Sequence, residues 1–557
     1  MPPFLMADKE AYVHRLISSF LIVLFTASTL PNPALAAGRS AALGAGNSRG
    51  EETATPIKHI VVIFGENISF DHYFGVYPNA ANPKGEPQFI ARPGSPSVNG
   101  LTDALLHNNP NFLNSTGNGT GALNPFRLDR SQAATADQDH DYTPEQEAFH
   151  AGLMDAFPQF TGTAGPPPSG ITNKGLVMGY YDGNTVTALW NYAQNFALND
   201  NAYGSTFGPS TPGAINLISG QTNNVTDQAN ASGDVIEDGG GGYTLISDAD
   251  PIGDVCSTTT GATVQLTGTN IGDLLSAKDI SWGWFQGGFD LSLKNSNGTT
   301  GCKRTTTSAV TGETESDYIQ HHEPFQYYTQ TANPKHLRPS SVSAIGLNGD
   351  PANHQYDIND FYAAVKNGNM PAVSFLKAPG FEDAHAGYSD PLDEQTFVTT
   401  VINLLQQSRD WDSTAVIINY DDSDGWYDHQ LGAVVNPSTT AADALTGTGQ
   451  CGTGTDTALP GPSGATHAQG RCGYGPRLPY LVISPYAKDN YVDHTMLDQS
   501  STIRFIEDNW LGGQRIGNGS FDAVAGSIDS MFDFSRPRQG TFILNPSTGE
   551  PVSSFRY

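Results

Sequence analysis

Residues 57–75 read IKHIVVIFGENISFDHYFG, and this stretch decides the fold. Its apolar run at residues 60–64 is short, continuous and rich in β-branched side chains, which is typical of a strand buried on both faces. Gly65 ends the run, and the polar pair Glu66 and Asn67 follows at once. Open α/β sheets carry their chemistry where buried strands end. The pair therefore marks either a functional site or a loop whose polar groups only cap the strand.

The composition narrows the class of protein. The chain has 557 residues, enough to bury a large core, and 38% of them are hydrophobic and 15% charged. These values, with 61 glycines and 36 prolines, are typical of a soluble globular protein with many loops. The formal net charge of −29 comes without any block of lysine or arginine, which argues against a nucleic-acid partner.

The N-terminus predicts export. Two basic residues precede an apolar run at residues 16–30, and the small-residue site Ala34-Leu35-Ala36 follows. This pattern predicts a signal peptide over residues 1–36 and a linker over residues 37–56, hence a secreted or periplasmic protein. The alternative is an uncleaved anchor, but the run is shorter than the roughly 20 residues that a membrane span needs. We therefore predict no stable membrane insertion, and the sequence leaves the oligomeric state open.

The four cysteines fit an oxidising compartment. Cys256 and Cys302 lie in one loop-rich region, and Cys451 and Cys472 lie in another. Of the three connectivities that four cysteines allow, we favour pairing of neighbours, Cys256 with Cys302 and Cys451 with Cys472. The closely spaced pairs of a zinc or redox site are absent from the sequence, so we interpret all four as structural.

Strands and helices alternate along the chain, which predicts an α/β fold with a mostly parallel central sheet flanked by helices. We assign this domain to residues 57–515 and a C-terminal extension to residues 516–557. The expected strands are 60–64, 196–198, 280–285, 372–376, 414–419 and 479–484. The expected helices are 144–155 with Thr143 as N-cap, 187–195, one starting at Pro212, 270–278, 358–365, 394–407 and 498–510. Loop-rich insertions are expected at about 79–135, 221–270, 286–318 and 433–473.

A serine stands before one of these helices. Residues 208–214 read GPSTPGA, and Pro212 suits the first helical position with Thr211 as N-cap. Ser210 then lies just outside a helix N-terminus, where unpaired N–H groups and the helix dipole bind anions and favour deprotonation of a hydroxyl. The alternative is that Ser210 is only part of a turn.

Carboxylates gather at the strand ends. Asp421 and Asp422 follow the strand at 414–419, and with Glu66 and Asn67 they would supply three carboxylates and an amide oxygen. Like charges so close raise each other's pKa unless a cation lies between them. An all-oxygen set favours one divalent ion such as Ca²⁺, Mg²⁺ or Mn²⁺, with Zn²⁺ as the alternative if a histidine joins. A metal-free loop network of solvated aspartates is the other interpretation.

Four histidines lie near the expected strand ends: His140 in the run DQDHDY, His321 and His322 in HHEPF, and His385. Phosphoryl transfer needs a nucleophile, positive charge on the phosphoryl oxygens and an acid for the leaving oxygen. A serine, a metal ion and several histidines can supply these parts. Each histidine alone can be structural, but four at one edge of a sheet favour a shared site.

The sequence resembles the bacterial phosphoesterase family, which contains secreted phospholipases C and a group of acid phosphatases. The resemblance covers about residues 57–511 and includes the opening stretch, DQDHDY, FGPSTPGAINLISG, HHEPF, residues 378–389, NYDDSDGWYDH and GYGPRLPYLVISPY. It implies an alkaline-phosphatase-like fold and a phosphoserine intermediate on Ser210. It also implies metal ligands at Glu66, Asn67, Asp421, Asp422 and Ser210, and phosphate-contacting or acid roles for His140, His322 and His385, with His321 a weaker candidate. Asn67 would also donate to phosphate through its NH₂ group.

Two departures from the family pattern guide the functional prediction. Many of its phospholipases C carry Thr followed by Trp-Pro-Asn-Arg where this chain has residues 210–214, Ser-Thr-Pro-Gly-Ala, and they often extend into C-terminal β domains. Both differences favour an acid-phosphatase-like enzyme acting on small phosphomonoesters. The alternatives are a phospholipase C acting on phosphatidylcholine-type lipids and a non-catalytic exported protein that holds structural calcium. Gln499 stands where many relatives have histidine, and the sequence offers no explanation for it.

Overall fold

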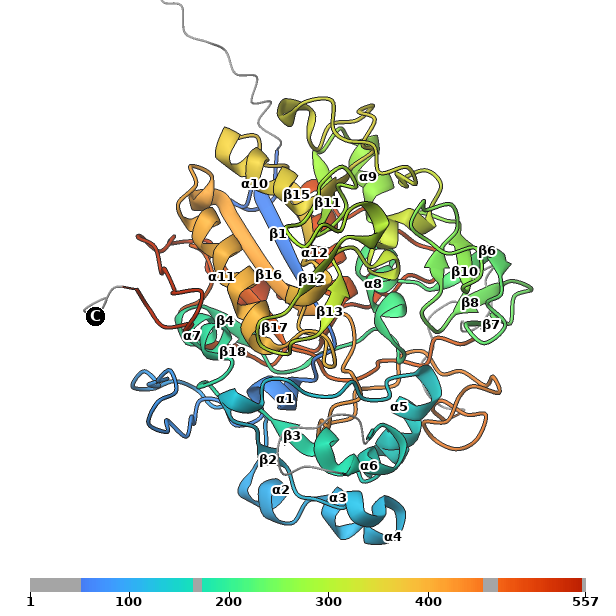
Figure 1. Ribbon diagram of the computed structural model, residues 1–557, viewed down its shortest axis with the longest axis vertical. Coiled ribbons are helices and arrows are strands. Elements are labelled where there is room, and N and C mark those ends of the chain that lie inside the picture. Colours follow the sequence, from blue (N-terminus) through green and yellow to red (C-terminus); the bar gives the residue numbers. More distant parts are fainter. Residues whose placement is uncertain (1–51, 164–172, 454–468, 553–557) are drawn as a thin grey trace, which may run out of the picture. The chain divides into compact units, whose positions relative to one another are not determined.

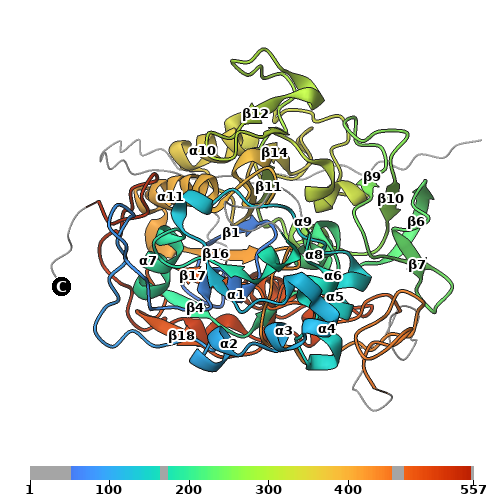
Figure 2. The same ribbon diagram turned by 60° about the horizontal axis from the view of Figure 1, so that its bottom comes forward.

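The computed structural model describes residues 52–163, 173–453 and 469–552 (Figures 1 and 2). The predicted signal peptide and most of the predicted linker lie outside these residues. Within the described ranges, no helix combines the length and the apolar character needed to cross a membrane.

An eight-stranded sheet forms the centre of the domain. Strand β17 is antiparallel to both of its neighbours and every other neighbouring pair is parallel, which confirms the predicted α/β class. The short edge strands β14 and β18 were not predicted. In sheet order the strands are β14 (Gln355–Asp357), β11 (Trp282–Gln286), β15 (Val373–Lys377), β1 (His59–Gly65), β16 (Thr414–Tyr420), β17 (Tyr480–Ile483), β4 (Ala197–Asn199) and β18 (Tyr491–Asp493).

Helices cover both faces of this sheet (Figures 1 and 2). One face carries α7 (Thr187–Asn195), α10 (Ile358–Asn367) and α11 (Pro391–Gln406), and the other carries α8 (Ser210–Ser219), α9 (Ile271–Ala277) and α12 (Ser500–Trp510). This division follows from right-handed crossovers that run in opposite directions along the sheet. Because β1, β4, β11, β15 and β16 are parallel, their carboxyl ends lie at one edge, as the strand-end argument requires.

Shorter elements occupy the connections. The region after β1 holds α1 (Phe70–Phe74), α2 (Asp103–His107), α3 (Pro110–Leu113), α4 (Ser115–Asn118), β2 (Phe126–Arg127), α5 (Tyr142–Phe149), α6 (Phe157–Phe160) and β3 (Gly179–Tyr180). The 221–270 insertion is a small sheet of β6 (Asn223–Ala229), β7 (Val235–Glu237), β8 (Tyr243–Leu245), β9 (Asp250–Pro251) and β10 (Thr263–Leu266). Two further strand pairs are β12 (Thr305–Thr307) with β13 (Thr314–Ser316), and β5 (Ala202–Tyr203) with β19 (Leu497–Asp498).

Several predicted helix starts are wrong. Helix α11 begins at Pro391 rather than at residue 394, and α12 begins at Ser500 rather than at residue 498. Helix α8 begins at Ser210 rather than at Pro212, and Thr211 does not cap it, because Asp248 of the 221–270 insertion accepts the N–H of Thr211 at 2.9 Å. Helix α5 runs only over Tyr142–Phe149, and its N-cap is Asp141. Thr143 instead donates its hydroxyl to a carbonyl oxygen in the 433–473 insertion. At α8 the acceptor comes from far along the chain, whereas at α5 the N-cap is local and its side chain makes no hydrogen bond to the helix.

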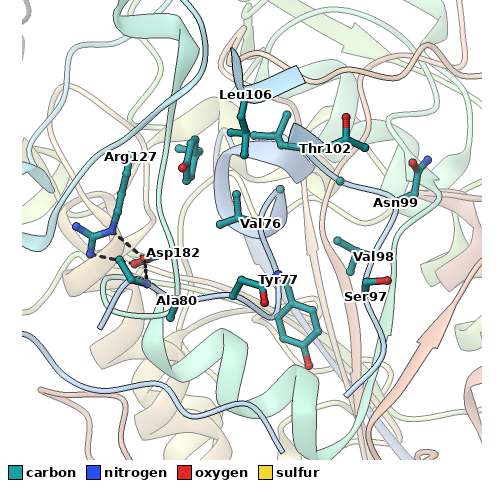
Figure 3. Close-up of a pocket in the computed structure, with 16 residues that line it drawn as sticks. Val76, Tyr77, Ala80, Ser97, Val98, Asn99, Thr102, Leu106, Arg127 and Asp182 are labelled. Carbon is teal, nitrogen blue, oxygen red and sulfur yellow. Dashed lines mark hydrogen bonds and ion pairs between the residues drawn. The ribbon is translucent and has the colours of Figure 1, made fainter. Parts of the chain in front are cut away.

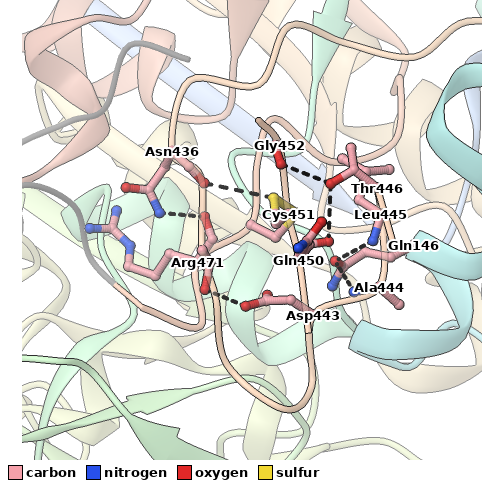
Figure 4. The surroundings of a disulfide bond; sticks show 12 residues. Gln146, Asn436, Asp443, Ala444, Leu445, Thr446, Gln450, Cys451, Gly452 and Arg471 are labelled. Carbon is pink, nitrogen blue, oxygen red and sulfur yellow. Dashed lines mark hydrogen bonds between the residues drawn. A yellow bond between two sulfur atoms is a disulfide. The ribbon is translucent and has the colours of Figure 1, made fainter. Parts of the chain in front are cut away.

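The structure contains the two predicted disulfides, Cys256–Cys302 and Cys451–Cys472. In the chain-entropy account, closing loops of this length stabilises the folded state by about 3–4 kcal/mol each. Figure 4 shows how the segment just before the second disulfide is tied to the body of the domain: the Gln146 side chain of α5 accepts the N–H groups of Ala444 and Leu445 at 3.0 and 3.2 Å.

A buried carboxyl group predicts how stability depends on pH. Glu394 of α11 accepts the hydroxyls of Tyr73 and Tyr420, and burial raises the pKa of Glu394 to about 7. Because this pKa is raised, the stabilising contribution is full below the ordinary carboxyl pKa near 4.5 and is lost as the pH rises through 7. We expect the melting temperature to fall between pH 5 and pH 8, and to fall less steeply in Glu394→Gln. The exposed Glu237→Gln is the control, and equal slopes in the two variants would contradict this account.

Candidate active site

Three chain segments meet around the hydroxyl of Ser210. Its Oγ lies 2.9 Å from Glu66 Oε2, 3.2 Å from Asn67 Oδ1 and 3.2 Å from Asp422 Oδ2. Glu66 and Asn67 follow β1, Asp422 follows β16, and Ser210 is the first residue of α8. All four side chains are buried. The structure therefore brings together residues as far apart in the sequence as Glu66 and Asp422.

Asn67 joins two halves of this region. Its backbone has φ 59°, in the left-handed region that asparagine tolerates better than most residues. While Oδ1 faces Ser210, Nδ2 donates to Asp424 Oδ1 at 3.1 Å and lies 3.4 Å from His140 Nε2. One amide thus contacts both the serine and a histidine.

Asp421 lies beside Ser210 rather than against it. Its Oδ1 accepts the N–H groups of Asn67 and Asp422 at 2.9 and 2.8 Å, and its Oδ2 lies 3.2 Å from Lys377 Nζ. Asp421 is therefore engaged by donors of the chain itself, whereas the three other predicted oxygen donors, Glu66, Asn67 and Asp422, contact the Ser210 hydroxyl.

The hydrogen bonds of Gln499 explain the role of an amide side chain at this position. Its amide nitrogen donates to the carbonyl oxygens of Tyr420 and Asp421, and its Oε1 accepts the N–H of Ser205 at 3.1 Å. A side-chain amide offers both donors and an acceptor, so it can join the end of β16 to the segment that leads into α8. The approach is close, because a Cβ added at Gly213 would collide with the carbonyl oxygen of Asp421.

Lys377 is the main residue that the sequence reasoning missed. It ends β15, its side chain is fully buried, and its ammonium group contacts Glu66 Oε1 and Asp421 Oδ2. Burial alone would lower the pKa of Lys377, but the charges of Asp421 and Glu66 outweigh it and raise that pKa. A lysine at the end of an otherwise apolar strand was the available signal, since lysine is almost never buried without a partner.

The carboxylates carry more negative charge than Lys377 balances. Burial and the charge of Asp421 raise the pKa of Glu66 well above its ordinary value, and burial does the same for Asp422. In spite of burial, the charge of Lys377 holds the pKa of Asp421 below its ordinary value. Buried carboxylates of this kind, with an amide and a hydroxyl oxygen, fit a hard divalent cation.

The predicted histidines divide into two groups. His140, His321 and His385 line a cavity of about 540 Å³ together with Asp137, Asp248 and Tyr388. His322 is buried behind the carboxylates, with Nδ1 3.2 Å from Glu66 Oε1. Neighbours in the sequence, His321 and His322 therefore contact different parts of the site.

The pKa shifts group the four histidines differently: the pKa is raised in two of them and lowered in the other two. Burial lowers the pKa of His140, but the charges of Asp422 and Asp424 outweigh it and raise that pKa well above its ordinary value. Nearby aspartates likewise raise the pKa of His321 in spite of burial. Burial lowers the pKa of His385 to about 4 and holds that of His322 well below its ordinary value. These shifts favour the protonated form of His140 and, to a lesser degree, of His321, whereas burial favours the neutral forms of His322 and His385.

Glu145 was also missed, because nothing in its stretch of sequence distinguishes it from a surface helix residue. This buried side chain of α5 accepts the hydroxyl of Ser423 at 2.6 Å and the N–H of Gly208 at 3.1 Å. It connects the loop that carries Asp422 with the loop that precedes Ser210.

A second cavity, of about 520 Å³, lies past the end of α1 (Figure 3). Apolar side chains such as Val76 and Val98 line it, and none of the predicted site residues does. Its arginine, Arg127, is held by Asp182, with Nε 2.8 Å from Oδ2. This cavity therefore does not offer a free cation to a phosphate group.

The chain matches known proteins over most of its length. The Phosphoesterase family matches residues 57–511. A non-hemolytic phospholipase C of Burkholderia pseudomallei is 25% identical over 514 residues, which are 89% of this chain and 61% of that protein. Phospholipase C B of Mycobacterium tuberculosis is 24% identical over 509 residues, 89% of this chain and 81% of that protein.

The chain spans less than two thirds of the Burkholderia protein. Among solved structures, a protein in the alkaline phosphatase superfamily from Vibrio parahaemolyticus matches with a TM-score of 0.26 and 12% identity, over 58% of this chain and 60% of that chain. The family match covers most of the chain, and this protein belongs to the Phosphoesterase family.

Proposed function

We propose that this chain is an exported, metal-dependent phosphoester hydrolase that cleaves phosphomonoesters through a phosphoserine intermediate. The observation that carries the proposal is the position of Ser210 Oγ, which is at the first residue of α8 and lies 2.9 Å from Glu66. The Asn67 amide joins it to His140 on the cavity wall. The two disulfides support export, since such bonds persist in oxidising compartments.

The residues around Ser210 fit a divalent metal ion by the chemistry of their donors. Glu66, Asn67, Asp422 and Ser210 would hold it, with Asp421 as a further ligand, and Ca²⁺, Mg²⁺ or Mn²⁺ suits these oxygens better than Zn²⁺. When bound, such an ion supplies positive charge to the phosphoryl oxygens and lowers the pKa of a nearby hydroxyl.

The chain's own groups account for the remaining chemistry. In the proposed reaction Ser210 Oγ attacks the phosphorus atom while its proton passes to one of the carboxylates around it. The bond from phosphorus to the leaving oxygen breaks, and His140, which can hold a proton, gives that proton to the leaving oxygen. Water then hydrolyses the phosphoserine and releases phosphate.

The remaining histidines have positioning or contact roles in this proposal. His385 and His321 face the cavity and would contact phosphate or the leaving group, and the NH₂ group of Asn67 would contribute a donor. His322 touches Glu66 and would hold that carboxylate in place. Because His140 and His321 keep their protons in mild acid, we place the best activity there.

A second candidate function has a specific observation in its favour, since the relatives quoted above are named phospholipases C. The same nucleophile serves monoesters and diesters, so the choice concerns the substrate. We favour monoesters because residues 210–214 depart from the motif that many family phospholipases C carry.

The test compares the two substrates on one preparation. We expect purified protein supplied with Mn²⁺ to release p-nitrophenol from p-nitrophenyl phosphate with a kcat/KM at least about tenfold higher than for diacylglycerol release from phosphatidylcholine vesicles, a difference of about 1.4 kcal/mol. The reverse order would establish the phospholipase function instead. If chelation lowered the melting temperature but neither substrate was turned over, the chain would be a non-catalytic metal-binding protein.

A further inference from the structure

Four side chains on the cavity wall form a cluster distinct in chemistry from the oxygen donors at Ser210. Asp137, His140, His385 and Asp424 each offer one ligand atom, and these atoms all lie within 4.8 Å of one another. Asp424 is fully buried, the two histidines are partly buried, and Asp137 is exposed. Three of the four line the 540 Å³ cavity, so an ion can reach the cluster from solvent.

Backbone carbonyl oxygens hold both imidazoles in place, and Nδ1 of His140 also lies 3.6 Å from Asp137 Oδ1 and 3.5 Å from Asp424 Oδ1. Nδ1 of His140 lies 2.8 Å from the carbonyl oxygen of Gln138, and Nδ1 of His385 lies 2.6 Å from that of Ala386. A carbonyl oxygen can only accept, so each Nδ1 carries a hydrogen and Nε2 is the nitrogen left to bind an ion. His140 Nε2 lies 3.4 Å from the Asn67 amide nitrogen, and His140 must release its second proton before this nitrogen can bind. A backbone carbonyl that fixes one ring nitrogen commonly leaves the other to bind a metal.

In the two other clusters of potential ligands in the described part of the chain, a disulfide or an arginine already engages the ligand atoms. Cys256 of the Asp254–Cys256–His336 group is in a disulfide. In the Asp71–Asp428–His429 group, Arg477 Nη2 lies 2.9 Å from Asp71 and 3.1 Å from Asp428 and supplies the positive charge. Neither disulfide involves the four residues of the cavity cluster.

We infer that Asp137, His140, His385 and Asp424 bind Zn²⁺ or a similar transition-metal ion, separately from the hard-cation site at Ser210. Two imidazoles with two carboxylates are a four-ligand set that suits zinc, whereas the donors at Ser210 are all oxygen. An ion there occupies the histidines that would contact phosphate and so inhibits hydrolysis. The inhibition rests on the proposed function, and the binding does not.

The experiment titrates Zn²⁺ into the full chain preloaded with Mn²⁺, by calorimetry, while electron paramagnetic resonance follows any Mn²⁺ released. Asp137→Asn removes the exposed ligand, and Asp141→Asn removes the same charge from the same DQDHDY run but outside the cluster. We expect one Zn²⁺ per chain without release of Mn²⁺, an affinity unchanged in Asp141→Asn, and an affinity at least about tenfold lower in Asp137→Asn. Zinc should inhibit phosphate release with the same order of affinities.

Three results would overturn the inference: no zinc binding, equal affinities in the two variants, or one Mn²⁺ released for each Zn²⁺ bound. The binding arm needs no substrate, so an inactive protein would refute the proposed function and leave this site standing. Zinc binding that followed the expected order without inhibition would refute only the inhibitory role.

Discussion

Ser210→Ala is expected to lower kcat for hydrolysis of p-nitrophenyl phosphate by at least about 10³-fold, the scale typical of losing a nucleophile. The hydroxyl oxygen lies within 3.2 Å of three other oxygens, and the three other serine and threonine hydroxyls nearest in sequence have separate surroundings. Thr206 accepts the side-chain N–H of Asn216 at 3.0 Å. Ser205 donates to Asp498, and the Thr211 hydroxyl is buried without a hydrogen-bond partner. No neighbouring hydroxyl of the run is therefore placed to substitute for Ser210.

The measurement is steady-state kinetics with circular dichroism to verify folding. Ser219→Ala is the matched control, because Ser219 ends the same helix. Its hydroxyl donates to the carbonyl oxygens of Ile215 and Gln221 and accepts the hydroxyl of Tyr328 at 3.1 Å. Full activity in Ser210→Ala would exclude the phosphoserine intermediate. Acid-stable, alkali-labile phosphate retained on the wild-type chain after rapid acid quenching would support it.

Lys377→Met is expected to lower the free energy of unfolding by about 3–5 kcal/mol, the usual cost of removing one partner of a buried ion pair. The ammonium group contacts Glu66 and Asp421, both almost fully buried, so the variant leaves two carboxylates without their positive partner. A divalent cation bound beside Glu66 would offset part of that charge. The loss should therefore be larger in EDTA than with saturating Mn²⁺.

Denaturant unfolding at pH 7, with and without EDTA, measures both effects. Lys366→Met is the control, because this lysine is exposed on α10 and a surface change of this kind should stay within about 0.5 kcal/mol. A Lys377→Met protein as stable as the control would show that the carboxylates do not depend on this cation. Equal losses in EDTA and in Mn²⁺ would contradict the proposed position of the metal ion.

The central sheet could be predicted because its strands carry local signals. The β-branched runs at residues 60–64 and 414–419 are buried on both faces in the structure, and polar residues follow each of them directly. Strands β14 and β18, with three residues each, carry too few side chains for such a pattern. Their pairing comes from neighbours in the sheet rather than from their own sequence.

The candidate site could be predicted only in part, for a similar reason. Glu66, Asn67, Ser210 and Asp422 stand in recognisable runs, and the structure brings them together. The contribution of Lys377 depends on contacts between separate strands, and the cap on Thr211 comes from Asp248, 37 positions away. Such long-range partners leave no mark on the local sequence.

The cap from Asp248 bears on how this protein can be recombined with its relatives. The 221–270 insertion resembles a detachable module, yet one of its carboxylates holds the first turn of the helix that presents Ser210. A chimaera that imported the corresponding segment from another member would need an acceptor at the same place. Without such an acceptor, the chimaera can fold and still hold the Ser210 side chain in the wrong orientation.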